Sequence, residues 1–426
     1  MHGRLAVPGR TTPPPRAGAA PPPFTRAFWV IVHRWAGLTI ALFLIVAGFT
    51  GAIMPFEETL GYATRPDAAQ VAPHAPAARP LDAVAIAERV ERQTGGRVSY
   101  LPLDVPRDHA MRVFVSPRAG APPLGYDVVW VDPFSGRVRL TYTFGGVRDG
   151  VQDIVPFLYS VHYGAVAGAW GVFAFGLAAL VWTANCLVGF GLSLPSGRRG
   201  WWRRFGQVFA IRRWSGFKLT FDLHRAGGLW LWPLLLVFAW AAVALAIPQV
   251  ETPVRRLLGG EGEYEAPALK MPLEAPPLGR RAAIARGLDA LTAQGRRDGF
   301  AVERPTTLYY LADSGSYRLY ARTTLDPSHD KGHTQVVLDA RDGRVLHYAP
   351  PTGRTAADRA VAWAEMLHRA QMWGLPYRIF VSAFGLLVAA LSATGVMIWQ
   401  RKRAARLAHR ARPTARGRRP GAEPIR

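Results

Sequence analysis

The sequence predicts an α-helical polytopic membrane protein with four transmembrane helices and two extracytoplasmic α+β domains, arranged as an internal two-fold repeat. Three observations predict this fold class: four apolar segments of membrane length, positive charge concentrated in three other segments, and two halves that carry matching motifs. Four such segments in one chain disfavour a soluble protein.

The predicted membrane-spanning regions are residues 28–54, residues 156–194 with their outer approach, residues 224–248, and residues 359–400, which include an outer helix. Each contains an apolar run longer than the roughly 20 residues that a helix needs to cross a bilayer core. The first run also exceeds the apolar region of roughly 7–15 residues in a signal peptide. We therefore interpret it as a span and not as a cleaved leader.

Positive charge predicts the orientation. The formal net charge is +23, and most of it lies in the two tails, residues 1–27 and 401–426, and in the middle connection, residues 195–223. Cytoplasmic loops are enriched in Lys and Arg. We expect a bacterial inner-membrane protein with both termini in the cytoplasm and with residues 55–155 and 249–358 in the periplasm. This distribution favours a topology signal over a nucleic-acid partner.

Four histidines occupy matching places beside the spans. His33 and His224 open the first and third spans, whereas His162 and His368 precede the second and fourth. Because the spans alternate in direction, His33 and His224 are expected at the cytoplasmic face and His162 and His368 at the outer face. Each pair could supply the two axial nitrogens of a haem iron. We predict two b-type haems, which need no Cys-x-x-Cys-His motif, and none is present.

Further residues fit a haem at the cytoplasmic pair. Arg34 and Arg225 follow the histidines and could meet the haem propionates. Gly37 and Gly228 lie about one helical turn further on, where a missing side chain would let a flat macrocycle approach the backbone. The alternative interpretation is that each histidine marks the point where a helix enters lipid.

The two periplasmic segments share a pattern of a helix followed by alternating strands. Their most similar parts are residues 128–138 and 336–345, which both predict a strand, a turn with Asp and Gly, and a returning strand. We interpret Asp132 and Asp339 as turn formers and not as acid–base groups. No catalytic side chain is predicted, and the four histidines are predicted only as haem ligands.

With these hairpins, and with Thr50-Gly51 and Thr394-Gly395 near span ends, the chain resembles the PepSY-associated transmembrane family. Within that family it is similar to inner-membrane di-haem ferrisiderophore reductases. The resemblance covers about residues 28–403. It implies an Fe(III)-siderophore as electron acceptor, release of Fe(II), and two PepSY-like domains that form a dock above the outer haem.

The source of the electrons must lie outside the chain. No glycine-rich nucleotide motif follows a strand, and no cytoplasmic segment is large enough for a flavin or nicotinamide domain. The donor is therefore a membrane quinol or a separate cytoplasmic reductase. A competing hypothesis is a membrane-anchored PepSY module that binds or regulates an envelope peptidase without redox activity. An uptake permease fits less well, because no polar pathway crosses the midplane.

Overall fold

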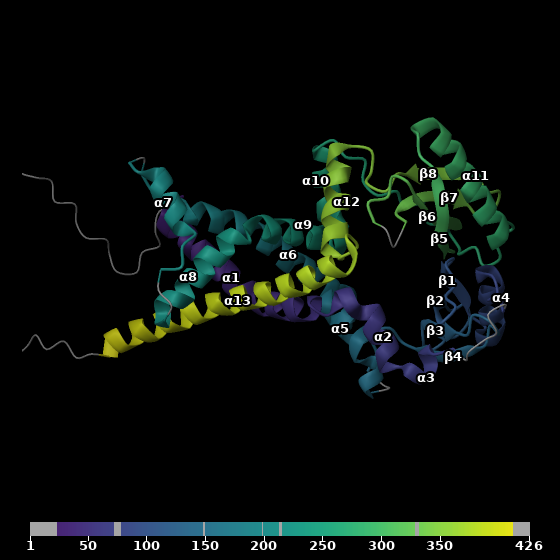
Figure 1. Ribbon diagram of the computed structural model, residues 1–426, viewed down its shortest axis with the longest axis horizontal. Coiled ribbons are helices and arrows are strands. Elements are labelled where there is room, and N and C mark those ends of the chain that lie inside the picture. The colour runs from purple at the N-terminus through teal and green to yellow at the C-terminus, as the bar shows by residue number, and fades with distance from the viewer. Residues whose placement is uncertain are drawn as a thin grey trace, which may run out of the picture.

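The structure is a computed structural model, and a helical bundle and a sheet lie at its opposite ends (Figure 1). The ranges that the structure describes are residues 24–71, 78–147, 150–197, 199–212, 215–328 and 332–411. The outer parts of both predicted tails, residues 1–23 and 412–426, lie outside these ranges.

The bundle contains the apolar helices. Its members are α1 (Arg26–Gly51), α6 (Gly168–Ser193), α8 (Gly216–Trp230), α9 (Trp232–Ala246) and α13 (Gly374–Ala411). Three helical segments, which contain α1, α6 and α13, are long and apolar enough to cross a membrane. Both ends of the described chain lie at the end of the bundle away from the sheet (Figure 1). We name this the termini end, and the opposite end the sheet end.

The predicted third span is a bent pair of helices. Its first residues belong to α8, which begins at Gly216, and a bend of 71° at Leu231 separates α8 from α9. Pro233 lies in the first turn of α9. Proline has no N–H to donate, and it disfavours helical geometry in the residue before it, so the helix breaks there. Counted as one broken span, the pair brings the candidate spans to four.

The predicted fourth region, residues 359–400, contains two helices. α12 (Ala356–His368) is followed by α13, whose 38 residues continue past position 400 through the basic segment to Ala411. Between them, Ala370 and Trp373 have positive φ angles of 54° and 49°. This conformation is unusual for residues with a side chain, and it turns the chain sharply directly after His368.

Short helices connect the bundle with the sheet. They are α2 (Glu57–Thr64), α3 (Pro66–Ala69), α5 (Ile154–His162), α10 (Pro248–Leu257) and α12. The chain passes from α5 into α6 through Gly164, which has a φ of +82°. A Cβ atom on Gly171 would meet the Gly164 carbonyl oxygen at 2.0 Å, so this turn requires glycine at both places.

The strands of both predicted periplasmic domains form one antiparallel sheet of eight strands in the order β4-β3-β2-β1-β5-β6-β7-β8. The strands are β1 (Arg97–Pro102), β2 (Met111–Ser116), β3 (Val128–Val131), β4 (Val138–Tyr142), β5 (Val302–Leu311), β6 (Ser316–Thr323), β7 (Thr334–Asp339) and β8 (Val345–Ala349). The halves meet where Tyr100 pairs with Tyr309. Without this pairing β1 and β5 would both be exposed edges, which proteins avoid.

Two longer helices cover one face of the sheet, and α2 and α3 pack on the other face at β3 and β4. α4 (Ala83–Thr94) lies on the first four strands and α11 (Arg280–Asp298) on the last four, on the side away from the bundle (Figure 1). One continuous core joins both halves and includes Ile86, Leu291 and Leu308. The sheet therefore presents its other face to the sheet end of the bundle.

The structure confirms that Asp132 and Asp339 form turns. The Asp132 carboxylate accepts a hydrogen bond of 2.9 Å from the Phe134 N–H, and Asp339 accepts one of 2.9 Å from the Arg341 N–H. Gly136, at the end of the first turn, has a positive φ of 66°.

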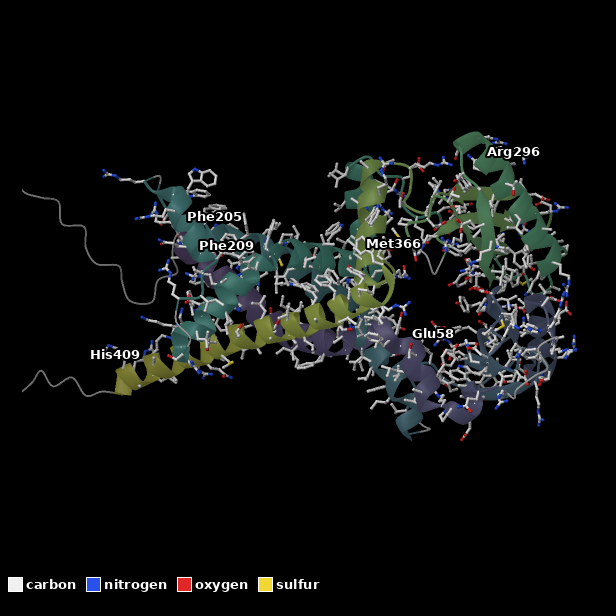
Figure 2. The ribbon with its side chains drawn as sticks, viewed as in Figure 1. Glu58, Phe205, Phe209, Arg296, Met366 and His409 are labelled. Carbon is white, nitrogen blue, oxygen red and sulfur yellow. The ribbon has the colours of Figure 1, made fainter. Side chains whose placement is uncertain are left out.

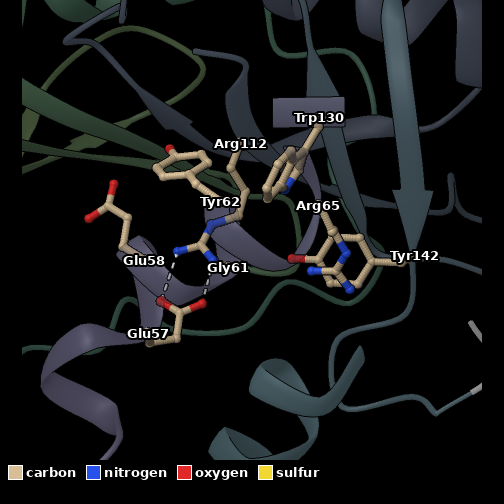
Figure 3. A pocket seen from close by; sticks show the side chains of 8 residues that line it. All are labelled: Glu57, Glu58, Gly61, Tyr62, Arg65, Arg112, Trp130 and Tyr142. Carbon is tan, nitrogen blue, oxygen red and sulfur yellow. Dashed lines mark hydrogen bonds and ion pairs between the residues drawn. The ribbon is translucent and has the colours of Figure 1, made fainter. Parts of the chain in front are cut away.

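Ion pairs anchor the sheet to the helices at its β4 edge. The buried Arg65 guanidinium donates to Asp153 over 2.8 Å and stacks 4.1 Å from the centre of the Tyr142 ring. Nearby, Arg112 on β2 makes two hydrogen bonds, of 2.7 and 3.4 Å, to the Glu57 carboxylate on α2 (Figure 3). These contacts fix the orientation of the sheet relative to α1, which α2 extends.

Candidate functional site

The four predicted histidines lie in two pairs. His33 on α1 faces His224 on α8, with ring centres 6.4 Å apart, toward the termini end. His162, the last residue of α5, faces His368, the last residue of α12, with ring centres 6.2 Å apart at the sheet end. We name these the termini-side pair and the sheet-side pair. Both pairings are those predicted from the sequence.

The spacing within each pair fits a metal ion held between two imidazoles. Two metal–nitrogen bonds of about 2 Å and two ring half-widths of about 1 Å place the ring centres about 6 Å apart. The two separations therefore fit a pair of axially ligated haems.

At the sheet-side pair, hydrogen bonds fix the tautomers. The Thr50 hydroxyl donates to the Val46 carbonyl over 2.8 Å, so its oxygen accepts from Nδ1 of His162 over 3.0 Å. Nδ1 of His368 donates to the Phe238 carbonyl over 3.3 Å. Each Nδ1 thus carries the proton, which leaves the Nε2 lone pair for a metal.

His224 of the termini-side pair follows the same arrangement. Its Nδ1 lies 3.0 Å from the Leu391 carbonyl and 3.1 Å from the Thr394 hydroxyl, which itself donates to Leu391. The fourth histidine differs, because Nδ1 of His33 is buried without a hydrogen bond of normal geometry. It faces Asn185 on α6, whose Oδ1 is also buried and unpaired.

Glycines on neighbouring helices make room for three of the rings. A Cβ atom would lie 2.8 Å from Cε1 of His162 if added to Gly51, and 2.9 Å from Cε1 of His33 if added to Gly189. Added to Gly395, it would lie 3.1 Å from Cε1 of His224. Real Cβ atoms rarely approach other atoms so closely, so each glycine permits a contact that alanine would disturb.

The other predicted site residues occupy different surroundings. Arg34 stacks over Trp35 at 5.4 Å, and Arg225 pairs with the Asp222 carboxylate over 2.9 Å. Gly37 faces Asn185, the neighbour of His33, whereas a Cβ on Gly228 would meet only Leu391, at 4.0 Å. Arg225 therefore has a protein partner, and Gly228 borders more open space than Gly37 does.

Sequence reasoning missed Asn185 and Gly189 and gave no role to Thr50-Gly51 and Thr394-Gly395. An asparagine inside an apolar span was the available signal for α6, because polar groups at membrane depth usually serve a function. The two Thr-Gly motifs were noticed only as part of a resemblance. In the structure, both residues of the first motif lie against the His162 ring, and both residues of the second lie against the His224 ring.

Burial affects the charge of the sheet-side pair. It lowers the pKa of His162 to about 4 and that of His368 to about 3. Both rings are therefore neutral near pH 7, as a metal-ligating imidazole must be. Within the described ranges, no three or more His, Cys, Asp or Glu side chains form a group that could hold a bare metal ion. A haem needs only two protein ligands, because the macrocycle supplies the others.

The pairs lie at different depths of the bundle. His33 and the His162 partner Thr50 both belong to α1 and are 17 residues apart, which corresponds to roughly 25 Å of helix. The hydrocarbon core of a bilayer is about 30 Å thick. Two redox centres at these pairs would therefore sit near opposite faces of the membrane.

A comparison with protein families identifies the PepSY-associated TM region over residues 30–402, which is most of the chain. A comparison with curated proteins found no match.

Proposed function

The chain belongs to the PepSY-associated transmembrane family, and we propose that it is a b-type di-haem oxidoreductase. In this proposal it passes electrons across the bacterial inner membrane to an Fe(III)-siderophore in the periplasm. The observation that carries the proposal is the presence of two histidine pairs, with ring centres 6.4 and 6.2 Å apart, at different depths of one apolar bundle.

The chain's own residues would hold the two haems. His33 and His224 would ligate one iron and His162 and His368 the other, each through Nε2. Hydrogen bonds from Nδ1 support this assignment for three of the four rings, since they fix both ring rotation and tautomer. Haem b would supply one-electron transfer at potentials set by these ligands and their surroundings. Arg34 remains the candidate for a propionate partner at the termini-side pair.

The electron balance is simple. Each Fe(III) taken up in the chelate accepts one electron and becomes Fe(II), which the siderophore binds more weakly. A quinol that gives up two electrons and two protons would support two such reductions, and a separate cytoplasmic reductase would serve equally. The two halves of the sheet would act as PepSY-like domains that hold the acceptor above the sheet-side pair.

Sidedness follows from charge in this proposal. The Lys- and Arg-rich segments would lie in the cytoplasm, so the termini end is the electron entrance and the sheet end is the exit. A reporter fused after Arg403 should behave as cytoplasmic, and one inserted near Gly120 as periplasmic. The opposite result would reverse the electron path.

A reduced-minus-oxidised visible spectrum of the purified protein, expressed with ample haem, tests the proposal directly. We expect b-type haem bands with two components. His33→Ala and His224→Ala should each remove the same component and leave the other, because a low-spin site needs both axial ligands. A colourless protein, or two unrelated partial losses, would refute the assignment. Co-purification of an envelope peptidase with a colourless protein would instead favour a non-redox PepSY anchor.

A further inference from the structure

The helices α1 and α13 pack closely against each other, and they run side by side through the bundle (Figure 1). A Cβ atom added to Gly48 would lie 2.5 Å from the Gly385 carbonyl oxygen, and one added to Gly385 would lie 2.7 Å from the Gly48 carbonyl oxygen. The two backbones are therefore in contact, and neither glycine leaves room for a side chain. Because packing this close resists displacement, we treat the two helices as one rigid element, the α1–α13 unit.

The α1–α13 unit orients one histidine of each pair. The Thr50 hydroxyl of α1 accepts from Nδ1 of His162 over 3.0 Å, and the Thr394 hydroxyl of α13 lies 3.1 Å from Nδ1 of His224. The glycine that follows each threonine lies against the same ring. Rotation and tautomer of these two rings are therefore fixed by closely packed helices.

The other histidine of each pair is held by different helices and through weaker hydrogen bonds. Nδ1 of His33 is buried without a hydrogen bond of normal geometry to any residue that the structure describes. Gly189 of α6 makes room for the His33 ring, but the residue before this glycine is Val188, whose side chain contains no acceptor. Nδ1 of His368 donates to the Phe238 carbonyl of α9 over the longer distance of 3.3 Å. Each pair thus combines a firmly held ring with a weakly held one.

We propose that the two histidines of each pair are unequal ligands, with His162 and His224 as the anchoring ligands and His33 and His368 as the exchangeable ones. This inference rests on the proposed function and adds an order among its four ligands. An imidazole whose Nδ1–H has an acceptor is held in one orientation and is the more basic ligand. A small neutral ligand from solution, such as free imidazole, would thus replace His33 or His368 before it replaced the other member of the pair.

Single alanine variants test this order in the full-length protein in detergent. Haem affinity is measured by titration, and the spin state of the bound haem by visible spectroscopy. We expect His224→Ala to lower haem affinity at the termini-side pair at least about tenfold more than His33→Ala does. Added imidazole should restore the low-spin spectrum of His33→Ala, because His224 still holds the haem, but not that of His224→Ala. At the sheet-side pair, His162→Ala should likewise cost more affinity than His368→Ala.

An exchange of the threonine separates its hydrogen bond from general packing effects. Thr394→Val together with Val188→Thr removes the acceptor at His224 and places one directly before Gly189, where the His33 ring lies. In this background the order of the two alanine variants should reverse. The sheet-side haem, whose ligands are unchanged, shows in each case that the bundle has folded. An order that stays the same after the exchange would overturn the inference.

Asn185 on α6 is the polar neighbour of His33, and it provides a second test. Its Nδ2 lies toward Gly37, where a Cβ atom would approach it to 3.3 Å. Its Oδ1 is buried and has no hydrogen bond of normal geometry within the described part of the chain. Asn185→Leu should therefore change haem affinity little. A loss as large as that caused by Thr394→Val would show that Asn185 anchors His33, and the proposed order would be wrong.

Two control variants remove similar groups elsewhere in the bundle. His409→Ala removes an exposed histidine near the end of α13 (Figure 2). Thr183→Val removes a hydroxyl that donates to the Ala179 carbonyl of its own helix, α6, over 2.9 Å. Both variants should bind two haems with the affinity of the unchanged protein.

The failure of this inference can be told apart from the failure of the proposed function. A protein with two haem components, in which both histidines of a pair cost equal affinity when changed to alanine, keeps the redox function and loses the order of ligands. A colourless unchanged protein refutes the redox function, and the order of ligands with it.

Discussion

The Thr50 hydroxyl on α1 accepts a hydrogen bond from Nδ1 of His162 over 3.0 Å. At the other end of the bundle, the Thr394 hydroxyl on α13 lies 3.1 Å from Nδ1 of His224 in the same arrangement. In both places the threonine gives its own proton to a carbonyl of its helix. Two unrelated helices thus orient one histidine of each pair by the same local device.

Thr50→Val should weaken haem binding at the sheet-side pair. Valine keeps the shape of threonine but removes the acceptor for Nδ1 of His162, and loss of such partners typically lowers metal affinity about 10–100-fold. Haem titration followed by difference spectroscopy measures the effect. Thr39→Val is the matched control, since Thr39 lies on the same helix and bonds only to the Ala36 carbonyl. Equal spectra for the two variants would remove the orienting role from Thr50.

Gly189→Ala should disturb the termini-side pair, because the new methyl group would lie 2.9 Å from Cε1 of His33. Gly191→Ala, two residues along α6, adds the same atoms where no other atom lies within 4 Å. We expect the first variant to lose one haem component and the second to keep both, in redox-titrated visible spectra. Intact spectra in both variants would show that the close contact at His33 has no consequence.

Arg65→Ala should destabilise the protein by about 3–5 kcal/mol, because it removes a buried ion pair with Asp153 and the contact of the guanidinium with the Tyr142 ring. Arg281→Ala breaks an ion pair with Asp82 whose side chains are more than half exposed, so it should change stability little. Thermal unfolding in detergent compares the two variants. A similar melting temperature for both would mean that the buried pair does not hold the sheet to the helices.

The histidine pairs could be predicted because a repeat, alternating span direction and matching places together determine which ring meets which. His33 with His224, and His162 with His368, required no knowledge of side-chain packing. The contacts around the rings could not be predicted, since Gly189 reaches His33 only through the packing of α6 against α1. Arg225, which was predicted to meet a propionate, also pairs with Asp222, three residues away on the same helix, and this pairing was not predicted.

Other parts of the fold depended on competing local effects or on long-range contacts. The apolar run from which a continuous third span was predicted contains Pro233. The helix breaks beside this proline, although the run is apolar on both sides of the break. The joining of two predicted domains into one sheet depends on three pairings between β1 and β5, from Tyr100 to Pro102. Strand alternation identifies the faces of a sheet, but it says nothing about which edges meet.

His368→Ala separates the electron entrance from the exit. If electrons leave through the sheet-side pair, this variant should lose reduction of an external Fe(III) chelate, measured by trapping Fe(II) with a colorimetric ligand. The haem component of His33 and His224 should still be reducible, because its own ligands lie roughly 25 Å of helix away. His409→Ala serves as a control, since this exposed histidine near the end of α13 belongs to neither pair. If His368→Ala lacked its haem component and still reduced the external chelate at the normal rate, the sheet-side pair would lie off the electron path. The acceptor would then have to receive its electrons elsewhere on the protein.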